Sequence, residues 1–568
     1  MKRLSKFLRG YVKESILGPL LKLAEATLEL IVPLVIAAIV DKGIATADRG
    51  YVISMSLVLV ALGVVGLIFS VTAQYFCAKA SVGFTAKLRL ALFKKMQTLS
   101  YTDIDRLGTS TMITRMTSDS SRVQSGLNLA LRLLLRSPFV VFGAAIMAFT
   151  IDVQSAMTFV FAIPVLSLII FGIMRITSPM YKKVQKGTDV ILEKTRENLF
   201  GVRVIRAFCK EEGELSDFER ENATLMNRQM QVGGISALLN PLTYVVINLA
   251  ILWLVQIGAV RVSLGALSAG AVLALYNYMS QILIELIKLA NLIVSITKAL
   301  ASASRIKESL NMTSTASSGS LTERDNTDIA VEFSSVGLTY RGAGAPALSD
   351  LSFSVKRGET VGIIGGTGSG KTSLVNLIPG FYPASEGEVK IFGHEVSEYS
   401  PEALLSFVGI VPQRAVLFSG SVRENMLSYN KNATDEEIIS ALGAAQILDT
   451  VMDMGGLDAK IEQGGTNLSG GQRQRLTVAR ALVGNPDILI LDDSASALDF
   501  ATDAAMRRAI KDSTTQKTLF IVSQRAFSVM HADKIIVVDD GHAVGIGTHD
   551  ELIESCEVYR EIYESQFA

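Results

Sequence analysis

The chain has 568 residues, of which 49% are apolar and only 19% are charged. This length exceeds what a single hydrophobic core usually supports, so we expect more than one domain. Its 54 basic and 54 acidic residues balance, which excludes the strong basic excess of a simple nucleic-acid-binding protein. The balance is a cancellation, because residues 1–310 hold 34 Lys and Arg against 20 Asp and Glu, whereas residues 311–568 hold 20 against 34.

Long apolar runs recur through residues 1–310, which we predict to form a membrane domain. Six of these runs approach or exceed the ~20 residues that a helix needs to cross the hydrocarbon layer. Residues 52–76 and 155–174 carry no charge, whereas a helix of a soluble protein keeps a polar face toward solvent. We therefore predict six membrane-spanning helices, at approximately 17–40, 52–78, 128–150, 155–175, 236–260 and 266–296.

The basic residues of this half indicate its orientation. Residues 79–136 hold ten Lys and Arg and residues 175–228 hold eleven, whereas the three short connections between spans hold only three in total. Because cytoplasmic loops are enriched in Lys and Arg, we predict a multi-pass protein of the cell (inner or plasma) membrane with both long loops and both termini in the cytoplasm. The two loops are too long for simple connectors, so we expect the membrane helices to continue into the cytoplasm.

Charged residues inside the predicted spans have two interpretations that the sequence leaves open. Lys22, Glu25 and Glu29 follow one another at intervals of one turn, and Glu285 and Lys288 lie one turn apart in the last span. Charges are costly in hydrocarbon. These residues either line a polar cavity or pair with one another within and between helices.

The polar, Ser- and Thr-rich residues 311–328 form a predicted linker to a second domain at 329–568. Alternating β and α patterns beyond the linker predict an α/β fold. The apolar strand expected at 360–364 leads directly into Gly-Gly-Thr-Gly-Ser-Gly-Lys-Thr at residues 365–372. This segment matches the phosphate-binding P-loop in its required strand–loop–helix context.

The P-loop residues predict a site for ATP and Mg²⁺. The glycines let backbone N–H groups surround the phosphates, and the start of the following helix favours negative charge. Lys371 supplies a cation at the β- and γ-phosphates, and the Thr372 hydroxyl can coordinate Mg²⁺. Asp492, at the end of the apolar strand 488–492, can hold the Mg²⁺ shell. The predicted phosphate-binding residues are Gly365, Gly366, Thr367, Gly368, Ser369, Gly370, Lys371, Thr372 and Ser373.

Between these motifs lies Leu-Ser-Gly-Gly-Gln at residues 468–472. At this point the sequence resembles the ATP-binding cassette (ABC) transporter family, for which this motif is the defining signature. The resemblance covers essentially the whole chain, and six spans followed by one cassette resemble a half-transporter of the exporter (type IV) fold. It implies that the helix start formed by Ser469, Gly470, Gly471 and Gln472 contacts ATP held by the P-loop of a partner subunit.

Further positions follow from the same resemblance. Tyr340 matches the aromatic residue that stacks on adenine, although it is also compatible with an ordinary strand tyrosine. Gln413 matches the residue that senses Mg²⁺ and contacts the membrane domain. Residues 496–499 match the D-loop. Residues 107–111 and 201–208 resemble the cytoplasmic loop regions that carry coupling helices.

The sequence departs from the family pattern at two catalytic positions. The family normally has Glu after the metal-binding aspartate, where it polarises the attacking water, but this chain has Asp493, which is one methylene shorter. The switch histidine of the family is replaced by Gln524, which can hydrogen-bond the γ-phosphate but cannot take up positive charge. Asp493, Gln524 and Gln413 form the expected catalytic set. Because small misplacements of catalytic groups are costly, we predict that this P-loop site hydrolyses ATP slowly or not at all, unless the changes are tolerated drift.

The resemblance implies ATP-driven export of an amphipathic substrate (a drug, lipid or peptide) by a heterodimer with a cytoplasmic ATPase domain. This chain contributes the degenerate site, and its intact signature completes the competent site of a partner that has Glu and His at the deviant positions and an altered signature. An ATP-binding regulatory subunit, an exporter-fold importer of a metal chelate and a slow homodimeric ATPase are the alternatives. The expected partners are a second half-transporter, the lipid bilayer and a small amphipathic substrate, but not nucleic acid.

Overall fold

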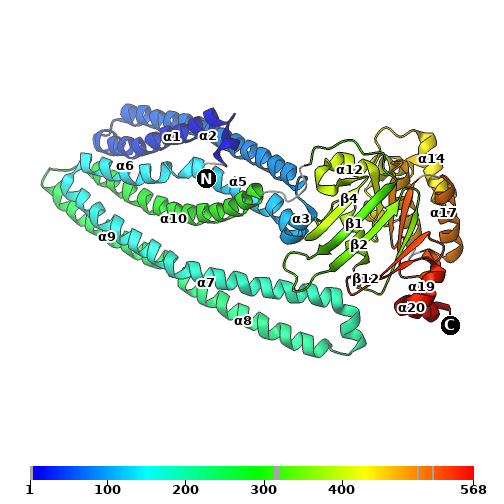
Figure 1. The fold of residues 1–568 in the computed structure, drawn as a ribbon. Coiled ribbons are helices and arrows are strands. Elements are labelled where there is room, and N and C mark those ends of the chain that lie inside the picture. The colour runs from blue at the N-terminus through cyan, green and yellow to red at the C-terminus, as the bar shows by residue number, and fades with distance from the viewer. Residues whose placement is uncertain (1–3, 313–318, 495–497, 514–516, 568) are drawn as a thin grey trace. The chain divides into compact units, whose positions relative to one another are not determined.

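The computed structural model describes residues 4–312, 319–494, 498–513 and 517–567 (Figure 1). The chain divides into two compact units. One consists of Met1–Met96 with Ser110–Met312, and the other consists of Gln97–Thr109 with Thr313–Ala568. The short segment Gln97–Thr109 therefore packs with the second unit although it lies inside the first unit along the sequence.

The first unit is built from long helices. Among the described residues, six helical segments are long and apolar enough to cross a membrane, which confirms the predicted six spans. The 48 residues of α2 and the 55 residues of α7 correspond to helices of about 70–80 Å, more than twice the ~30 Å hydrocarbon layer. The helices are α1 Val12–Ala38, α2 Arg49–Met96, α4 Thr109–Thr114, α5 Ser120–Leu133, α6 Arg136–Ile151, α7 Val153–Ala207, α8 Glu211–Ala237, α9 Leu239–Ser263 and α10 Ala269–Asn311.

Close contact between these helices depends on small residues. A Cβ at Gly126 of α5 would lie 2.2 Å from the Ala299 Cβ of α10, and a Cβ at Gly18 of α1 would lie 2.5 Å from the Cys77 sulfur of α2. Small side chains let helix backbones approach closely, and a larger side chain at either glycine would force the two helices apart. Helices α7 and α8 run side by side as a long hairpin (Figure 1).

The second unit contains two main sheets. The larger has the order β12-β11-β3-β10-β9-β6 and is parallel except for β12, and the smaller is the antiparallel sheet β2-β1-β4-β5. Continuous apolar runs such as β9 suit strands that are buried on both faces. The strands are β1 Ile329–Leu338, β2 Leu348–Lys356, β3 Thr360–Ile364, β4 Glu386–Ile391, β5 His394–Glu395, β6 Val408–Val411, β7 Gly420–Ser421, β8 Lys460–Ile461, β9 Ile488–Asp492, β10 Thr518–Ser523, β11 Lys534–Asp539 and β12 His542–Gly547.

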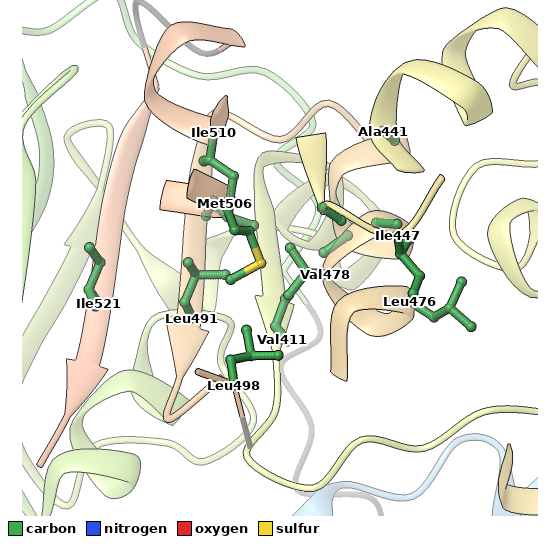
Figure 2. Packing of buried hydrophobic residues seen from close by; sticks show 14 of the residues in the cluster. Val411, Ala441, Ile447, Leu476, Val478, Leu491, Leu498, Met506, Ile510 and Ile521 are labelled. Carbon is green, nitrogen blue, oxygen red and sulfur yellow. The ribbon is translucent and has the colours of Figure 1, made fainter. Parts of the chain in front are cut away.

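Helices cover the larger sheet and bury a shared core. Figure 2 shows Leu491 of β9, Met506 of α17 and Val478 of α16 in this cluster. The arrangement confirms the predicted fold class, in which an α-helical six-span domain precedes an α/β P-loop domain. The helices of this unit are α3 Tyr101–Leu107, α11 Lys371–Leu377, α12 Pro401–Phe407, α13 Val422–Leu427, α14 Asp435–Ala444, α15 Leu448–Asp453, α16 Gly470–Val483, α17 Phe500–Ser513, α18 Ala526–Val529, α19 His549–Ser555 and α20 Glu557–Phe567.

Candidate functional site

The register of the parallel sheet brings the ends of three strands together. Val522 of β10 lies opposite Ile363 of β3 on one side and Asp492 of β9 on the other. Ligands of α/β proteins bind outside the carboxyl ends of parallel strands. The segments that follow β3, β9 and β10 therefore lie at one edge of the sheet, and these segments carry the residues predicted for the nucleotide site.

The loop between β3 and α11 requires glycine for two different reasons. A Cβ at Gly365 would lie only 2.0 Å from the Val538 carbonyl oxygen, and Gly370 has a φ of +105°, which L side chains rarely adopt. A Cβ at Gly366 or Gly368, in contrast, would meet no heavy atom within 4 Å. The loop is thus closely packed at Gly365 and has open space at Gly366 and Gly368, where a phosphate chain can approach the backbone.

Lys371 is held inside this loop by neutral groups. Its Nζ donates hydrogen bonds to the Gly365 carbonyl at 2.9 Å, the Gly366 carbonyl at 2.5 Å and the Ser369 hydroxyl at 3.4 Å. The residue is only 8% exposed, and this burial lowers the pKa of Lys371 although two nearby carboxylates act in the opposite direction. A phosphate that replaced the carbonyls would give the ammonium an ionised partner and a stronger hydrogen bond.

Thr372 and Asp492 form the pair predicted to hold Mg²⁺. The Thr372 hydroxyl donates to Asp492 Oδ1 at 3.2 Å. Burial is the main cause that raises the pKa of Asp492, the neighbouring Asp493 charge adds to it, and the hydrogen bond from Thr372 opposes it. Mg²⁺ prefers hard oxygen ligands and often takes only one or two from the protein, with phosphates and waters completing its shell. The hydroxyl and the buried carboxylate fit this ion.

Asp493 has a tightly fixed main chain. Its φ is +46°, its N–H donates to the Val522 carbonyl at 3.0 Å, and its carbonyl accepts from Gln474 of α16 at 3.3 Å. The Gln413 side-chain amide donates to Asp493 Oδ2 at 3.3 Å. The structure thus brings together two of the three residues predicted for the catalytic set.

Gln524, the third member of that set, follows β10 and lies against the P-loop. Its Oε1 accepts a long hydrogen bond of 3.5 Å from the Thr367 hydroxyl, and its side chain is exposed. This is the open side of the loop, where Gly366 and Gly368 leave space. The side-chain amide can therefore contact a phosphate bound there.

Tyr340, which follows β1, is fixed near the start of α11. Its hydroxyl donates to Ser373 Oγ at 3.0 Å, and its ring meets the edge of the Tyr382 ring at a centroid distance of 5.1 Å. An aromatic side chain in this place can stack on a base attached to phosphates in the loop. The Ser373 hydroxyl, one of the predicted phosphate-binding groups, accepts this hydrogen bond from Tyr340.

The signature residues form an N-terminal cap on α16. The Ser469 N–H donates to Gln472 Oε1 at 2.8 Å, and the Gln472 N–H donates to Ser469 Oγ at 3.2 Å, which is a capping box. Ser469 and Gly470 are exposed, whereas Gly471 and Gln472 are partly buried. Within the described parts of the chain, no hydrogen bond joins these four residues to the P-loop.

One set of contacts around α3 was not anticipated from the sequence. The Tyr101 ring stacks on Phe381 at 4.3 Å, and the Tyr382 hydroxyl donates to Asp105 Oδ2 at 2.6 Å. Tyr382 also touches the Tyr340 ring. The acidic and aromatic residues 101–105, within an otherwise basic segment, were the available signal.

Only part of the predicted D-loop can be placed. Ser496 and Ala497 lie outside the described residues. Asp499 caps the following helix, because its carboxylate accepts from both the N–H and the hydroxyl of Thr502. These hydrogen bonds lower the pKa of Asp499.

Comparisons with known proteins cover almost all of the chain. Residues 15–286 match the family described as "ABC transporter transmembrane region", and residues 348–496 match the family described as "ABC transporter". The Bacillus subtilis (strain 168) protein YfiB, an uncharacterized ABC transporter ATP-binding protein, is 34% identical over 568 residues, which cover 100% of this chain and 99% of the relative.

Two further proteins are similar over comparable lengths. The ATP-dependent lipid A-core flippase of Escherichia coli (strain K12) is 29% identical over 532 residues, which cover 93% of this chain and 91% of the flippase. The structure of a bacterial Atm1-family ABC exporter with ATP bound superposes with a TM-score of 0.80 and covers 99% of both chains. At 21% sequence identity, this second likeness shows a common fold.

Proposed function

The chain belongs to the ABC transporter family, and we propose that it is one half of a heterodimeric exporter that uses ATP to move an amphipathic molecule across the membrane. The observation that carries the proposal is an intact nucleotide site in which two catalytic positions are altered together. The contacts of Lys371 inside the P-loop and of Thr372 with Asp492 support binding of phosphates and Mg²⁺, whereas Asp493 and Gln524 stand where the family pattern has Glu and His.

The environment of Asp493 supports slow hydrolysis at this site. Its main chain is held by Val522 and Gln474, so a local backbone shift that compensated for the shorter side chain would break two hydrogen bonds. Its carboxylate is engaged by Gln413. Gln524 lies beside the P-loop but cannot accept a proton to become a cation. We infer that ATP is retained here through many turnovers.

The signature of this chain has a different role in the proposal. Ser469 and Gly470 expose the start of a 14-residue helix, where N–H groups and the helix dipole favour an anion. We propose that this helix start completes the ATP site on the P-loop of the partner subunit. Hydrolysis there resets the transporter.

The transported molecule is proposed to be amphipathic. A lipid A-core flippase is similar over 93% of this chain, and the first unit presents long apolar helices. We place the ATPase domain in the cytoplasm, because the basic residues of the first half concentrate in the two long loops. Closure of two cassettes on ATP would then turn the transport pathway outward.

A slow homodimeric ATPase is the second candidate. It is favoured by the carboxylate of Asp493, which remains beside Gln413 and could still orient a water. The two candidates differ in subunit composition and in the consequence of removing Asp493. A single purification followed by two substitutions separates them.

The experiment starts from the tagged full-length chain, purified in mild detergent with whatever copurifies from cells that also express the adjacent reading frames. We expect a second half-transporter with Glu and His at the deviant positions. Replacing that glutamate with Gln should abolish ATP turnover, whereas Asp493→Asn should cause a much smaller loss. Purification of the chain as an active homodimer, or complete loss of turnover in Asp493→Asn, would refute the heterodimer.

A further inference from the structure

The C-terminal helix α20 contacts the segment that carries Gln524. The Gln566 side-chain amide donates from Nε2 to the Gln524 carbonyl at 2.8 Å, and its Oε1 accepts from the Ala526 N–H at 2.8 Å. One side chain thus bridges two main-chain groups that lie two residues apart. No sequence motif marks this residue.

The Gln566 side chain caps the start of α18, a role that a residue next to the helix usually fills. The first N–H groups of a helix have no partner within the helix, and the side chain of Arg525, the N-cap residue of α18, has only donors and cannot accept from them. Ala526 is fully buried, so its N–H would be costly to leave unpaired. The primary amide of Gln566 offers the acceptor for this N–H and also a donor for the Gln524 carbonyl.

The helix that carries Gln566 is itself anchored in the core. Tyr559 of α20 is fully buried, and its hydroxyl lies 2.8 Å from His549 Nδ1. Ile562 and Tyr563 pack against the hydrophobic cluster that also contains Ala526 of α18. Gln566 therefore extends from a fixed helix to the segment that follows β10.

We propose that Gln566 is a positioning residue of the nucleotide site, which acts by holding the Gln524 main chain so that the Gln524 side chain stays beside Thr367. Between the two bridged groups, the Arg525 N–H donates to Ser523 Oγ at 2.9 Å, so successive main-chain groups are all fixed. The inference rests on the proposed contact of Gln524 with the γ-phosphate. Because ADP lacks that phosphate, Gln566 should favour ATP over ADP.

The test measures equilibrium binding of radiolabelled ATPγS and ADP, each with Mg²⁺, to the full-length protein with its copurifying partner in lipid nanodiscs. We expect Gln566→Ala to weaken ATPγS binding about three- to tenfold, since the bridge consists of neutral hydrogen bonds, and to change ADP binding by less than about twofold. The matched control is Ser565→Ala, because among the described residues the neighbouring Ser565 hydroxyl bonds within its own helix, to the Ile562 carbonyl. The control should change neither affinity.

Two further variants separate positioning from a general structural role. In a Gln524→Ala background, Gln566→Ala should produce no additional loss, because the effect passes through Gln524. Gln566→Glu keeps an acceptor for the Ala526 N–H but loses the donor to Gln524, so it should lose part of the ATPγS preference with an unchanged unfolding temperature. This variant keeps the proposal testable if Gln566→Ala fails to fold.

Three results would overturn the inference: unchanged ATPγS binding in Gln566→Ala, an equal loss for ATPγS and ADP, or a loss that persists in the Gln524→Ala background. Failure of the proposed γ-phosphate contact would give a different result. If Gln524→Ala alone leaves the ATPγS preference intact, the γ-phosphate contact itself is refuted, and the role of Gln566 falls with it. If Gln524→Ala removes the preference and Gln566→Ala does not, only the positioning role fails.

Discussion

Arg136 in the first unit and Lys371 in the second are both buried cations, but carboxylates surround the first and neutral acceptors surround the second. Arg136 of the membrane unit and Lys371 of the ATPase unit are 7% and 8% exposed. Arg136 lies 2.7 Å from Glu285 Oε1 and 2.5 Å from Glu29 Oε2. Lys371, in contrast, bonds to backbone carbonyls and a hydroxyl. Arg136 is thus neutralised by carboxylates of its own chain, whereas Lys371 is held by neutral groups and can form an ion pair with a phosphate.

The difference separates a structural network from a binding site. A buried ion pair contributes mainly by avoiding the large cost of an unpaired partner, and the Arg136 network joins α1, α6 and α10 in this way. The other charges of the first and last spans also pair, because Lys22 lies 2.5 Å from Glu25 and Lys288 lies 2.8 Å from Glu285. Of the two interpretations that the sequence left open, these contacts favour pairing.

Removing Arg136 from its ion pairs with Glu285 and Glu29 should lower the stability of the first unit more than any other change proposed here. Arg136→Met would leave the buried Glu285 and the half-exposed Glu29 without their shared cation, and breaking such a pair costs about 3–5 kcal/mol. We expect a markedly lower unfolding temperature of the membrane unit in detergent. The fluorescence of Trp253, the only tryptophan of the chain, which lies in α9, reports this transition.

A control for this experiment is Arg175→Met, because Arg175 of α7 is exposed. The double variant Arg136→Met/Glu285→Leu should recover part of the lost stability, since it also removes the buried carboxylate that has lost one of its two cations and keeps only Lys288. An Arg136→Met variant as stable as the control would show that the network is not needed to hold the helices together.

Removing Lys371 should weaken ligand binding without lowering the stability of the protein, unlike the removal of Arg136. Lys371→Met should weaken MgATP binding at this site by about a hundredfold to a thousandfold, the loss expected when one member of a buried charge pair is removed. The ligand-free protein should be no less stable, because burial of the ammonium is a cost that the lowered pKa of Lys371 reveals. Equilibrium binding and a thermal scan measure the two effects.

Lys431→Met serves as the matched control, because Lys431 is an exposed lysine of the same unit. It should alter neither nucleotide binding nor the unfolding temperature. A fall in the unfolding temperature of ligand-free Lys371→Met would mean that the carbonyl contacts stabilise the loop, and the contrast with Arg136 would then be lost.

A third change should make the P-loop site of this chain hydrolyse ATP faster. Asp493→Glu combined with Gln524→His restores the family pattern around a phosphate loop that is already intact. We expect ATP turnover at this site to rise about tenfold, because correct placement of a catalytic group is worth up to ~10²-fold. Turnover is measured with the partner's glutamate replaced by Gln, so that the partner site is silent. Unchanged turnover in the double variant would place the limitation elsewhere.

The parts of the site that the sequence predicts are those made by local chain geometry. The spacing of glycines before Lys371 specifies a strand–loop–helix turn, and Ser469 with Gln472 three residues later specifies a capping box. The placement of Thr372 beside Asp492 is consistent with the ends of parallel strands β3 and β9, which flank β10, lying at one edge of the sheet. The six spans likewise follow from the length of the apolar runs.

The remaining contacts depend on tertiary packing. Gln566 meets Gln524 across 42 residues, Tyr382 meets Asp105 across 277, and Arg136 meets Glu285 across 149. One residue in each pair, Gln566, Tyr382 or Arg136, belongs to no motif in its own sequence neighbourhood. A polar side chain without a local motif acquires its partner only when distant elements pack, so sequence patterning does not identify it.

The smallest expected effect concerns the acid beside Lys371. Burial raises the pKa of Asp492 above its ordinary value of 3.8. Between the ordinary pKa and the raised pKa of Asp492, the folded protein binds more protons than the unfolded chain. The free energy of unfolding of the ligand-free protein therefore decreases as pH rises through this range. The slope is at most about 1.4 kcal/mol per pH unit. Calorimetry of the unfolding of the second unit at a series of pH values measures this slope.

Asp492→Asn isolates this contribution, because the amide keeps an acceptor for the Thr372 hydroxyl but does not titrate. Relative to this variant, the ligand-free wild type should lose stability as pH rises above about 4 and then reach a plateau. Adding MgATP at neutral pH should reverse the difference, because a cation at Asp492 offsets the buried negative charge. A stability difference independent of pH would show that burial does not disfavour ionised Asp492. The proposal that MgATP binding relieves the cost of burying Lys371 and Asp492 would then fail for Asp492.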